Sequence, residues 1–220
     1  MAKRPQPREM PEHMTARQRR DNWWRYHWLY VLIGVLAALV LAGVAWERIT
    51  RERYDCSVAL VTWYAAAPEE IASIQAALEA VCPDVDGDGE VHVAVNAIQI
   101  DYTSTRLDDA AIQVMTTNVD KLNADFYTRQ SGIFLLDDPE NFQRAHDALA
   151  YLDGSTPPEG ALDWEEMTIP WGAWSGSTQV ELRNCNGEQL WFARRAIYSD
   201  ADKAALANAG ALWAALWGET

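Results

Sequence analysis

The sequence lacks the short motifs that mark many enzymes. It contains no Ser-His-Asp arrangement, no HExxH or GxSxG sequence and no Walker loop that would cradle a phosphate. Its four histidines are scattered, and an isolated histidine is more often structural than catalytic: His13, His27, His92 and His146. These absences lead us to expect a protein that is not an enzyme.

Cysteine is scarce, and no CxxC or Cys/His spacing suggests a zinc site. Cys56 precedes the first predicted strand and Cys82 ends the first predicted helix. In a β-α unit the helix runs back, so its end lies near the start of the strand. An exported domain would then permit a disulfide between Cys56 and Cys82. Two free, partly buried thiols are the alternative, and Cys185 is left over in a turn.

Positive charge is also in deficit, since the 220 residues carry a formal net charge of −14. Residues 1–27 hold seven basic and three acidic side chains, a charge of +4, which leaves −18 for the rest of the chain. An acidic domain repels phosphate backbones, which argues against nucleic-acid binding. The hydrophobic fraction of 49% is too high for a disordered chain.

Charged residues are absent from residues 28–46, WLYVLIGVLAALVLAGVAW. As a helix this run would be about 28 Å long, close to the roughly 30 Å hydrocarbon core of a bilayer. The run predicts a single-pass transmembrane signal-anchor, with a buried soluble helix and a cleaved signal peptide as alternatives. Aromatic side chains that favour the headgroup level flank it: Trp23, Trp24, Tyr26, Trp28, Tyr30 and Trp46.

The flanking charges predict the orientation. Five basic residues from Arg8 to Arg25 precede the run, and Arg48, Arg51 and Arg53 follow it. The positive-inside rule then places the N-terminus in the cytoplasm and the C-terminal domain outside the cell membrane. We expect four parts: a basic cytoplasmic tail (1–27), a transmembrane helix (28–46), a juxtamembrane stalk (47–55) and an exported α/β domain (56–220).

Strands and helices are predicted to alternate after the stalk. Apolar and β-branched runs predict strands at residues 57–64, 90–100 and 132–137. Helical spacing of apolar residues and breaker positions predict helices at 69–81, 107–126 and 139–152. This β-α-β-α-β order is typical of an α/β fold in which helices cover a parallel sheet. Later segments predict short strands at 179–182 and 189–193 and a final helix at 200–217.

The segment DVDGDGEV resembles the first half of a calcium loop. Asp84, Asp86 and Asp88 alternate, and Gly89 stands where such a loop turns sharply. The twelfth position, which should be a bidentate Glu, is Val95. We therefore expect no cofactor, with weak calcium binding as a lesser possibility beside a tight acidic turn.

Candidate ligand-binding residues follow the first and third predicted strands. Parallel strands bring their carboxyl ends to one edge, where α/β folds bind ligands. Aromatic rings and carboxylates there are suited to a sugar or another flat ligand. The candidates are Trp63, Tyr64, Asp137 and Asp138, joined by Trp171 and Trp174 from a loop-rich region. The alternatives are a helix cap at Asp138, rings that fill a core, and a hydrolase that uses Asp137 or Asp138.

Four segments within residues 57–154 form a recognisable pattern: LVTWY, VHVAVNAI, TRQSGIFLLDDPENFQ and the helix end LAYLDG. Through them the chain resembles the first lobe of bacterial extracellular solute-binding proteins. A full receptor has a second lobe and more than 250 residues, and Cys56 lacks a lipobox. The resemblance therefore implies a truncated, membrane-tethered relative whose matching ligand positions are Trp63, Tyr64, Asp137 and Asp138.

Together these patterns predict a binding or interaction module of the bacterial cell envelope. Its expected partners are the lipid bilayer and a carbohydrate or peptide ligand, or a membrane or transporter protein. The alternative is an accessory protein that binds a partner protein and no small molecule. An exposed aromatic cleft favours the first and a flat apolar patch favours the second.

Overall fold

A computed structural model of the chain describes residues 15–50, 54–104, 108–182 and 189–218, with side chains omitted for 44–50. The chain divides into two compact units, Met1–Glu52 and Arg53–Thr220. We describe each unit by itself.

The first unit contains one long helix, α1 (Ala16–Thr50). Its segment Ala16–Gly43 is long and apolar enough to cross a membrane, and none of it is buried within the protein. The helix begins earlier than the predicted residue 28 and runs past residue 46. Residues 16–27 contain no proline or glycine, so nothing in their sequence stops the helix from extending.

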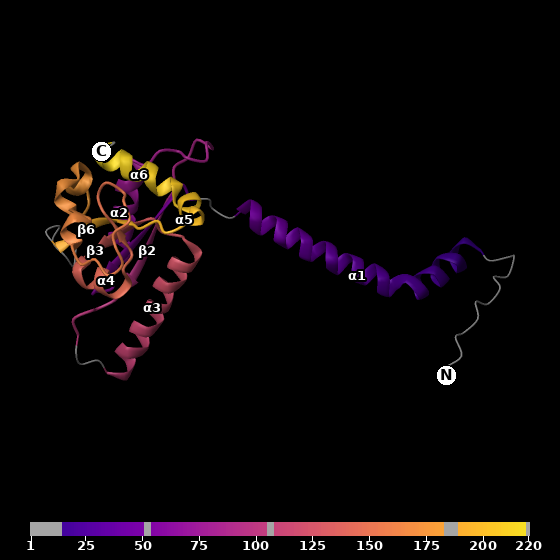
Figure 1. Ribbon diagram of the computed structural model, residues 1–220. Helices are drawn as coiled ribbons and strands as arrows, with labels where there is room; N and C mark the ends of the chain where they lie inside the picture. The colour runs from indigo at the N-terminus through magenta and orange to yellow at the C-terminus, as the bar shows by residue number, and fades with distance from the viewer. Residues whose placement is uncertain (1–14, 51–53, 105–107, 183–188, 219–220) are drawn as a thin grey trace. The chain divides into compact units, whose positions relative to one another are not determined.

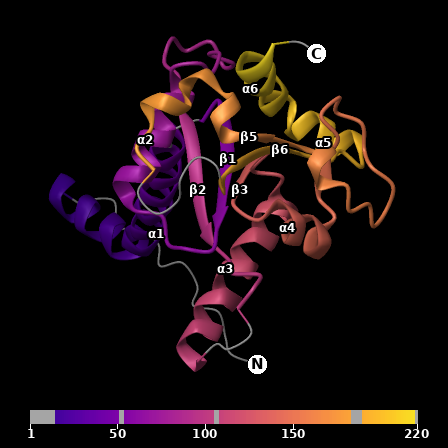
Figure 2. The same cartoon turned by 90° about the vertical axis from the view of Figure 1, so that its left-hand side faces the viewer.

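The second unit is a mixed α/β domain around one sheet (Figures 1 and 2). The strands lie in the order β2-β1-β3-β6-β4, and β5 also pairs with β6. Strands β2, β1 and β3 run parallel to one another. Strand β6 runs antiparallel to the three strands with which it pairs, β3, β4 and β5. The strands are β1 (Cys56–Thr62), β2 (Val93–Gln99), β3 (Ile133–Leu136), β4 (Leu149–Ala150), β5 (Thr168–Pro170) and β6 (Trp191–Arg195).

Helices cover both faces of this sheet. Neighbouring residues of a strand point to opposite faces, so each central strand contributes side chains to two cores. Val58 and Leu60 of β1 pack into one core with α2 and α6, whereas Ala59 and Val61 pack into the other with α3 and α4. The helices are α2 (Pro68–Glu79), α3 (Asp109–Thr128), α4 (Pro139–His146), α5 (Asp200–Ala205) and α6 (Ala207–Trp217). Short 3-10 turns are η1 (Trp164–Glu166), η2 (Trp171–Ala173) and η3 (Ser175–Gln179).

Three predicted elements differ in the structure. The helix predicted to reach residue 152 ends at His146, because Asp147 adopts a left-handed conformation and the chain then forms β4. Residues 179–182 form no strand, since Gln179 ends η3. The final helix is interrupted at Leu206, which separates α5 from α6. The predicted turn at 184–187, including Cys185, lies outside the described residues.

The strand order creates a crossover point at the carboxyl end of the sheet. β1 lies between β2 and β3, and the chain leaves β1 toward α2 on one face and β3 toward α4 on the other. Loops that diverge in this way leave a crevice, which is the usual ligand position in open α/β sheets. Trp63 follows β1 and Asp137 follows β3, so both lie at this point.

Candidate functional site

Two of the predicted residues meet at the crossover point. The Trp63 backbone N–H donates to Oδ2 of Asp137 across 2.6 Å. Loss of hydration raises the pKa of Asp137 to about 6, with a contribution from the negative charge of Asp138, and the Trp63 N–H only partly offsets this. Asp137 therefore ionises at a higher pH than an ordinary carboxyl group, and it remains partly open to solvent.

The two aromatic residues after β1 behave differently. The Trp63 side chain is 57% exposed, whereas Tyr64 is buried. The Tyr64 hydroxyl donates to Oε1 of Glu70 at 2.9 Å, and its ring meets the Trp63 ring edge-on at 5.6 Å. Tyr64 thus supports the loop, and Trp63 is the ring that a ligand can reach.

A small cavity lies beside this loop. Its volume is about 200 Å³, and it runs along the ends of β1 and β2 next to α3. The Gln99 side-chain amide donates to the Trp63 carbonyl oxygen at 3.2 Å, which ties the two strand ends together. The lining residues are Tyr64, Ala65, Ala66, Ala97, Ile98, Gln99 and Asn118.

A tyrosine–histidine pair at the same end was missed by sequence reasoning. Tyr102 follows β2, and its hydroxyl shares a 2.9 Å hydrogen bond with Nε2 of His146 at the end of α4. Burial lowers the pKa of His146; burial together with the charges of Asp138 and Asp137 raises the pKa of Tyr102. The rule that selected residues after β1 and β3 applies equally after β2 and would have found Tyr102.

The other three candidates do not present ligand groups at this end. Asp138 caps α4, because its carboxylate accepts from the Asn141 backbone N–H at 3.1 Å and from the Asn141 side chain at 2.8 Å. Trp171 and Trp174 are each 2% exposed and pack on Phe192 in the core on the α2 face. Their predicted place in an open cleft is therefore wrong, and the core-filling alternative describes them.

At the amino end of the sheet, Asp55 receives unusual backbone support. This side chain is 3% exposed, and its carboxylate accepts from the N–H groups of Val85, Asp86 and His92 at 2.7, 3.3 and 3.0 Å. Burial opposes ionisation of Asp55, but these donors outweigh it and lower its pKa. Asp55 was not a sequence candidate, since no local motif surrounds it.

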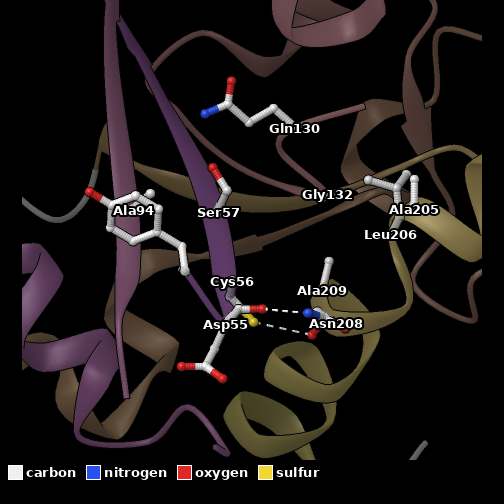
Figure 3. A pocket seen from close by; sticks show the side chains of 11 residues that line it. Asp55, Cys56, Ser57, Ala94, Gln130, Gly132, Ala205, Leu206, Asn208 and Ala209 are labelled. Atoms are coloured by element: carbon white, nitrogen blue, oxygen red, sulfur yellow. Dashed lines mark hydrogen bonds between the residues drawn. The ribbon is translucent and has the colours of Figure 1, made fainter. Parts of the chain in front are cut away.

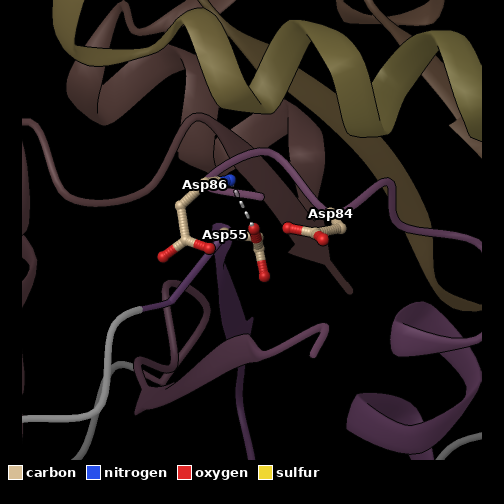
Figure 4. A group of neighbouring side chains, drawn as sticks. All are labelled: Asp55, Asp84 and Asp86. Atoms are coloured by element: carbon tan, nitrogen blue, oxygen red, sulfur yellow. Dashed lines mark hydrogen bonds between the residues drawn. The ribbon is translucent and has the colours of Figure 1, made fainter. Parts of the chain in front are cut away.

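The carboxylates of Asp55, Asp84 and Asp86 form a compact group. One oxygen from each lies within 4.8 Å of the others, with Asp55 entering from the start of β1 and the other two from the acidic loop (Figure 4). Asp88 accepts instead from the Glu90 N–H at 2.9 Å. The predicted calcium set is thus altered: Asp55 joins Asp84 and Asp86, and Asp88 lies outside the group.

The loop also stabilises itself without a cation. Asp84 accepts from the N–H groups of Gly87 and Gly89 at 2.7 and 2.9 Å, and both glycines have positive φ. This is the hydrogen bonding of a tight acidic turn, the alternative that the sequence allowed.

Cys56 and Cys82 are neighbours, as the β-α geometry predicts. Both are buried free thiols in the structure, and their Sγ atoms are 3.4 Å apart. The Cys56 thiol also donates to the Asn208 carbonyl at 3.2 Å, and the Asn208 amide donates to the Asp55 carbonyl at 2.8 Å (Figure 3). A cavity of about 230 Å³ adjoins this contact between β1 and α6.

Comparisons of the chain with protein-family models, with curated proteins and with solved structures find no match.

Proposed function

We propose that this protein is a membrane-anchored module whose α/β domain binds a ligand at the carboxyl end of its parallel strands. The observation that carries the proposal is the exposed side chain of Trp63 at the crossover point, where the Trp63 backbone N–H donates to the Asp137 carboxylate. The resemblance to one lobe of a solute-binding protein is consistent with this position and stays a prediction.

The chemistry of the two side chains favours a carbohydrate or a peptide. An exposed indole face stacks on the C–H face of a sugar or on an apolar side chain. The Asp137 carboxylate accepts a hydroxyl or amide hydrogen in its ionised form and donates one when protonated. Because one lobe leaves the ligand open to water, we expect a Kd on the order of millimolar to tens of micromolar.

Calorimetry against a panel of glycans and peptides tests the binding proposal, with the full-length chain held in lipid nanodiscs. We expect a ligand whose affinity falls at least tenfold in Trp63→Ala. Tyr127→Ala is the matched control, because Tyr127 is 84% exposed at the far end of α3. A ligand whose affinity is unchanged by Trp63→Ala would locate its site elsewhere.

The second half of the proposal is that α1 anchors the chain, with its N-terminus in the cytoplasm and the α/β domain outside. The anchor is supported by the uncharged residues 28–43 of this helix, none of which is buried within the protein. Leu36→Arg with Leu39→Arg should each cost about 2.5–3.5 kcal/mol of insertion and release the protein from membranes. The same positions changed to Ala are the control, and a double-arginine protein that still resists alkaline extraction would contradict the anchor.

A partner protein is the second candidate occupant of the domain surface. It is favoured by Ile112 of α3, an apolar side chain that is 49% exposed. If a partner binds there, Ile112→Ser should abolish its cross-linking to the chain, whereas Trp63→Ala should not.

A further inference from the structure

The paired thiols lie at the end of the sheet opposite the proposed ligand site, which makes no use of them. Cys56 begins β1, and Cys82 follows α2. The two side chains are 4% and 7% exposed, and their sulfur atoms are 3.4 Å apart. A disulfide requires a separation near 2.05 Å, so the sulfurs must approach by about 1.3 Å.

The acidic loop is attached to the sheet at the same place. Asp55 immediately precedes Cys56, and Asp84 follows Cys82 by two residues. The Asp55 carboxylate holds the loop through N–H groups of Val85, Asp86 and His92. Yet the carboxylates of Asp84 and Asp86 crowd Asp55 within 4.8 Å, and like charges at such distances repel.

We propose that Cys56 and Cys82 are oxidised to a disulfide that clamps the acidic loop, residues 83–92, to the start of β1. Without the disulfide, only the hydrogen bonds to Asp55 hold the loop against the repulsion among the three carboxylates. The disulfide adds a covalent link between the loop and β1. Its formation in the cell rests on the proposed export of the domain, because disulfides persist in oxidising compartments. The clamp itself is independent of where the ligand binds.

The oxidation is a dithiol–disulfide exchange with an external disulfide. The Cys82 thiolate attacks one sulfur of the oxidant, forms a mixed disulfide and releases the first oxidant thiolate. Cys56, after losing its proton, attacks Sγ of Cys82 and displaces the second. Two electrons pass to the oxidant, and its two released thiolates take up the two protons lost by the cysteines, so one protein disulfide and two small thiols result. The interaction with the neighbouring Cys56 side chain lowers the pKa of the Cys82 thiol, which suits Cys82 for the first attack.

The bond is tested first by mapping. Full-length protein carrying Cys185→Ser, so that only the pair can react, is incubated with oxidised glutathione, alkylated and digested without reductant. We expect Cys56 joined to Cys82 in most molecules. Alkylation of both thiols, or glutathione left on either, would overturn the proposed bond.

The clamp is tested by hydrogen exchange on the same protein before and after reduction. We expect the amides of Val85, Asp86 and His92 to exchange at least tenfold faster after reduction, and that of Ile98 to be unchanged. The isosteric Cys56→Ser with Cys82→Ser variant should match the reduced protein. Loop exchange that is equal in the oxidised, reduced and serine forms would refute the clamp even if the bond forms.

Mapping of the cysteine pair in cells distinguishes a failure of the disulfide proposal from a failure of the proposed membrane topology. Cells are quenched in acid and alkylated before lysis, and the pair is mapped in the membrane fraction. A bond found in cells supports both proposals. A pair that oxidises with glutathione in vitro but is reduced in cells supports the clamp geometry and contradicts the exported location.

Discussion

The two ends of the sheet shift the pKa of a carboxylate in opposite directions. At the amino end, Asp55 is almost fully buried but accepts from three backbone N–H groups, and its pKa is lowered. At the carboxyl end, Asp137 accepts from one backbone N–H group, that of Trp63. The loss of hydration and the negative charge of neighbouring Asp138 raise its pKa to about 6. At Asp55 three backbone donors together outweigh the loss of hydration, whereas at Asp137 the loss of hydration outweighs one donor.

The two ends also differ in how they are covered. At the amino end, α6 packs so closely on β3 that a Cβ on Gly132 would lie 2.3 Å from Cβ of Ala209. Both ends border a cavity, of about 230 Å³ at the amino end and about 200 Å³ at the carboxyl end, and at the carboxyl end the Trp63 ring stays 57% exposed. Because α6 packs closely at the amino end, we expect substitutions there to change stability most, whereas the proposed ligand would bind at the carboxyl end.

The largest expected effect is at the amino end. Asp55→Ala removes the acceptor of three N–H groups, each worth about 1.5 kcal/mol or more when the acceptor is charged, so we expect a loss of about 3–5 kcal/mol. Asp86→Ala is the control, because this exposed carboxylate accepts from the Asp88 N–H alone, and it should cost less than about 1 kcal/mol. Chemical denaturation of the full-length chain in detergent measures both. Equal losses would mean that the acidic loop does not depend on Asp55.

Close packing at the same end predicts the next effect. Gly132→Ala should cost about 1–3 kcal/mol, because the new methyl group must displace α6. Gly172→Ala is the control, since no atom lies within 4 Å of its Cβ position and its φ is not positive. Thermal unfolding of the two variants separates crowding from a general cost of removing glycine. A harmless Gly132→Ala would show that the C-terminal helices are loosely held.

The pH dependence of stability should have opposite signs at the two ends. The folded-state pKa of Asp137, about 6, exceeds the unfolded value of about 3.9, so its contribution is largest below about pH 4 and is lost as pH rises to 6. With solvent screening we expect about 1–2 kcal/mol. The lowered pKa of Asp55 works the other way: its contribution is present above the unfolded pKa and is lost as pH falls through the folded one.

Denaturation of the wild type and Asp137→Asn between pH 4 and 7 isolates the Asp137 contribution. The difference in free energy of unfolding between the two proteins should change across this range and be flat above pH 7. A constant difference would place an ordinary, fully hydrated carboxyl at position 137.

Sequence reasoning predicted the apolar helix and the α/β class, because both depend on local hydrophobic pattern, but it did not predict the antiparallel pairing of β6. It failed where a tertiary contact overrides the local pattern. Residues 147–152 are helical in composition, but a left-handed Asp147 and pairing of Leu149 with β6 end the helix. Trp171 and Trp174 are aromatic residues between chain breakers, and only the packing of Phe192 shows that they are core.

The candidate site was predicted only in part, again because several of its contacts join residues far apart in the sequence. Trp63 and Asp137 follow from strand ends alone, whereas the pairing of Tyr102 with His146 joins residues 44 positions apart and depends on where α4 ends. Asp55 lies about 30 residues from the loop that it supports, so no spacing rule could connect them.

The smallest expected effect is a cation response confined to the amino end. A divalent cation among Asp55, Asp84 and Asp86 would relieve their mutual repulsion, but the ligand set lacks the bidentate twelfth-position Glu, since that position is Val95. With a Kd of roughly 10 mM, 10 mM calcium would stabilise the fold by less than about 1 kcal/mol, a rise in Tm of about 1–3 °C. Differential scanning fluorimetry against sodium chloride of equal ionic strength measures this. Asp84→Asn should abolish the calcium-specific part, and Asp138→Asn at the other end should leave it intact. A rise that survives Asp84→Asn would place the cation outside this group, and one above about 10 °C would show that Asp55 substitutes fully for the missing glutamate.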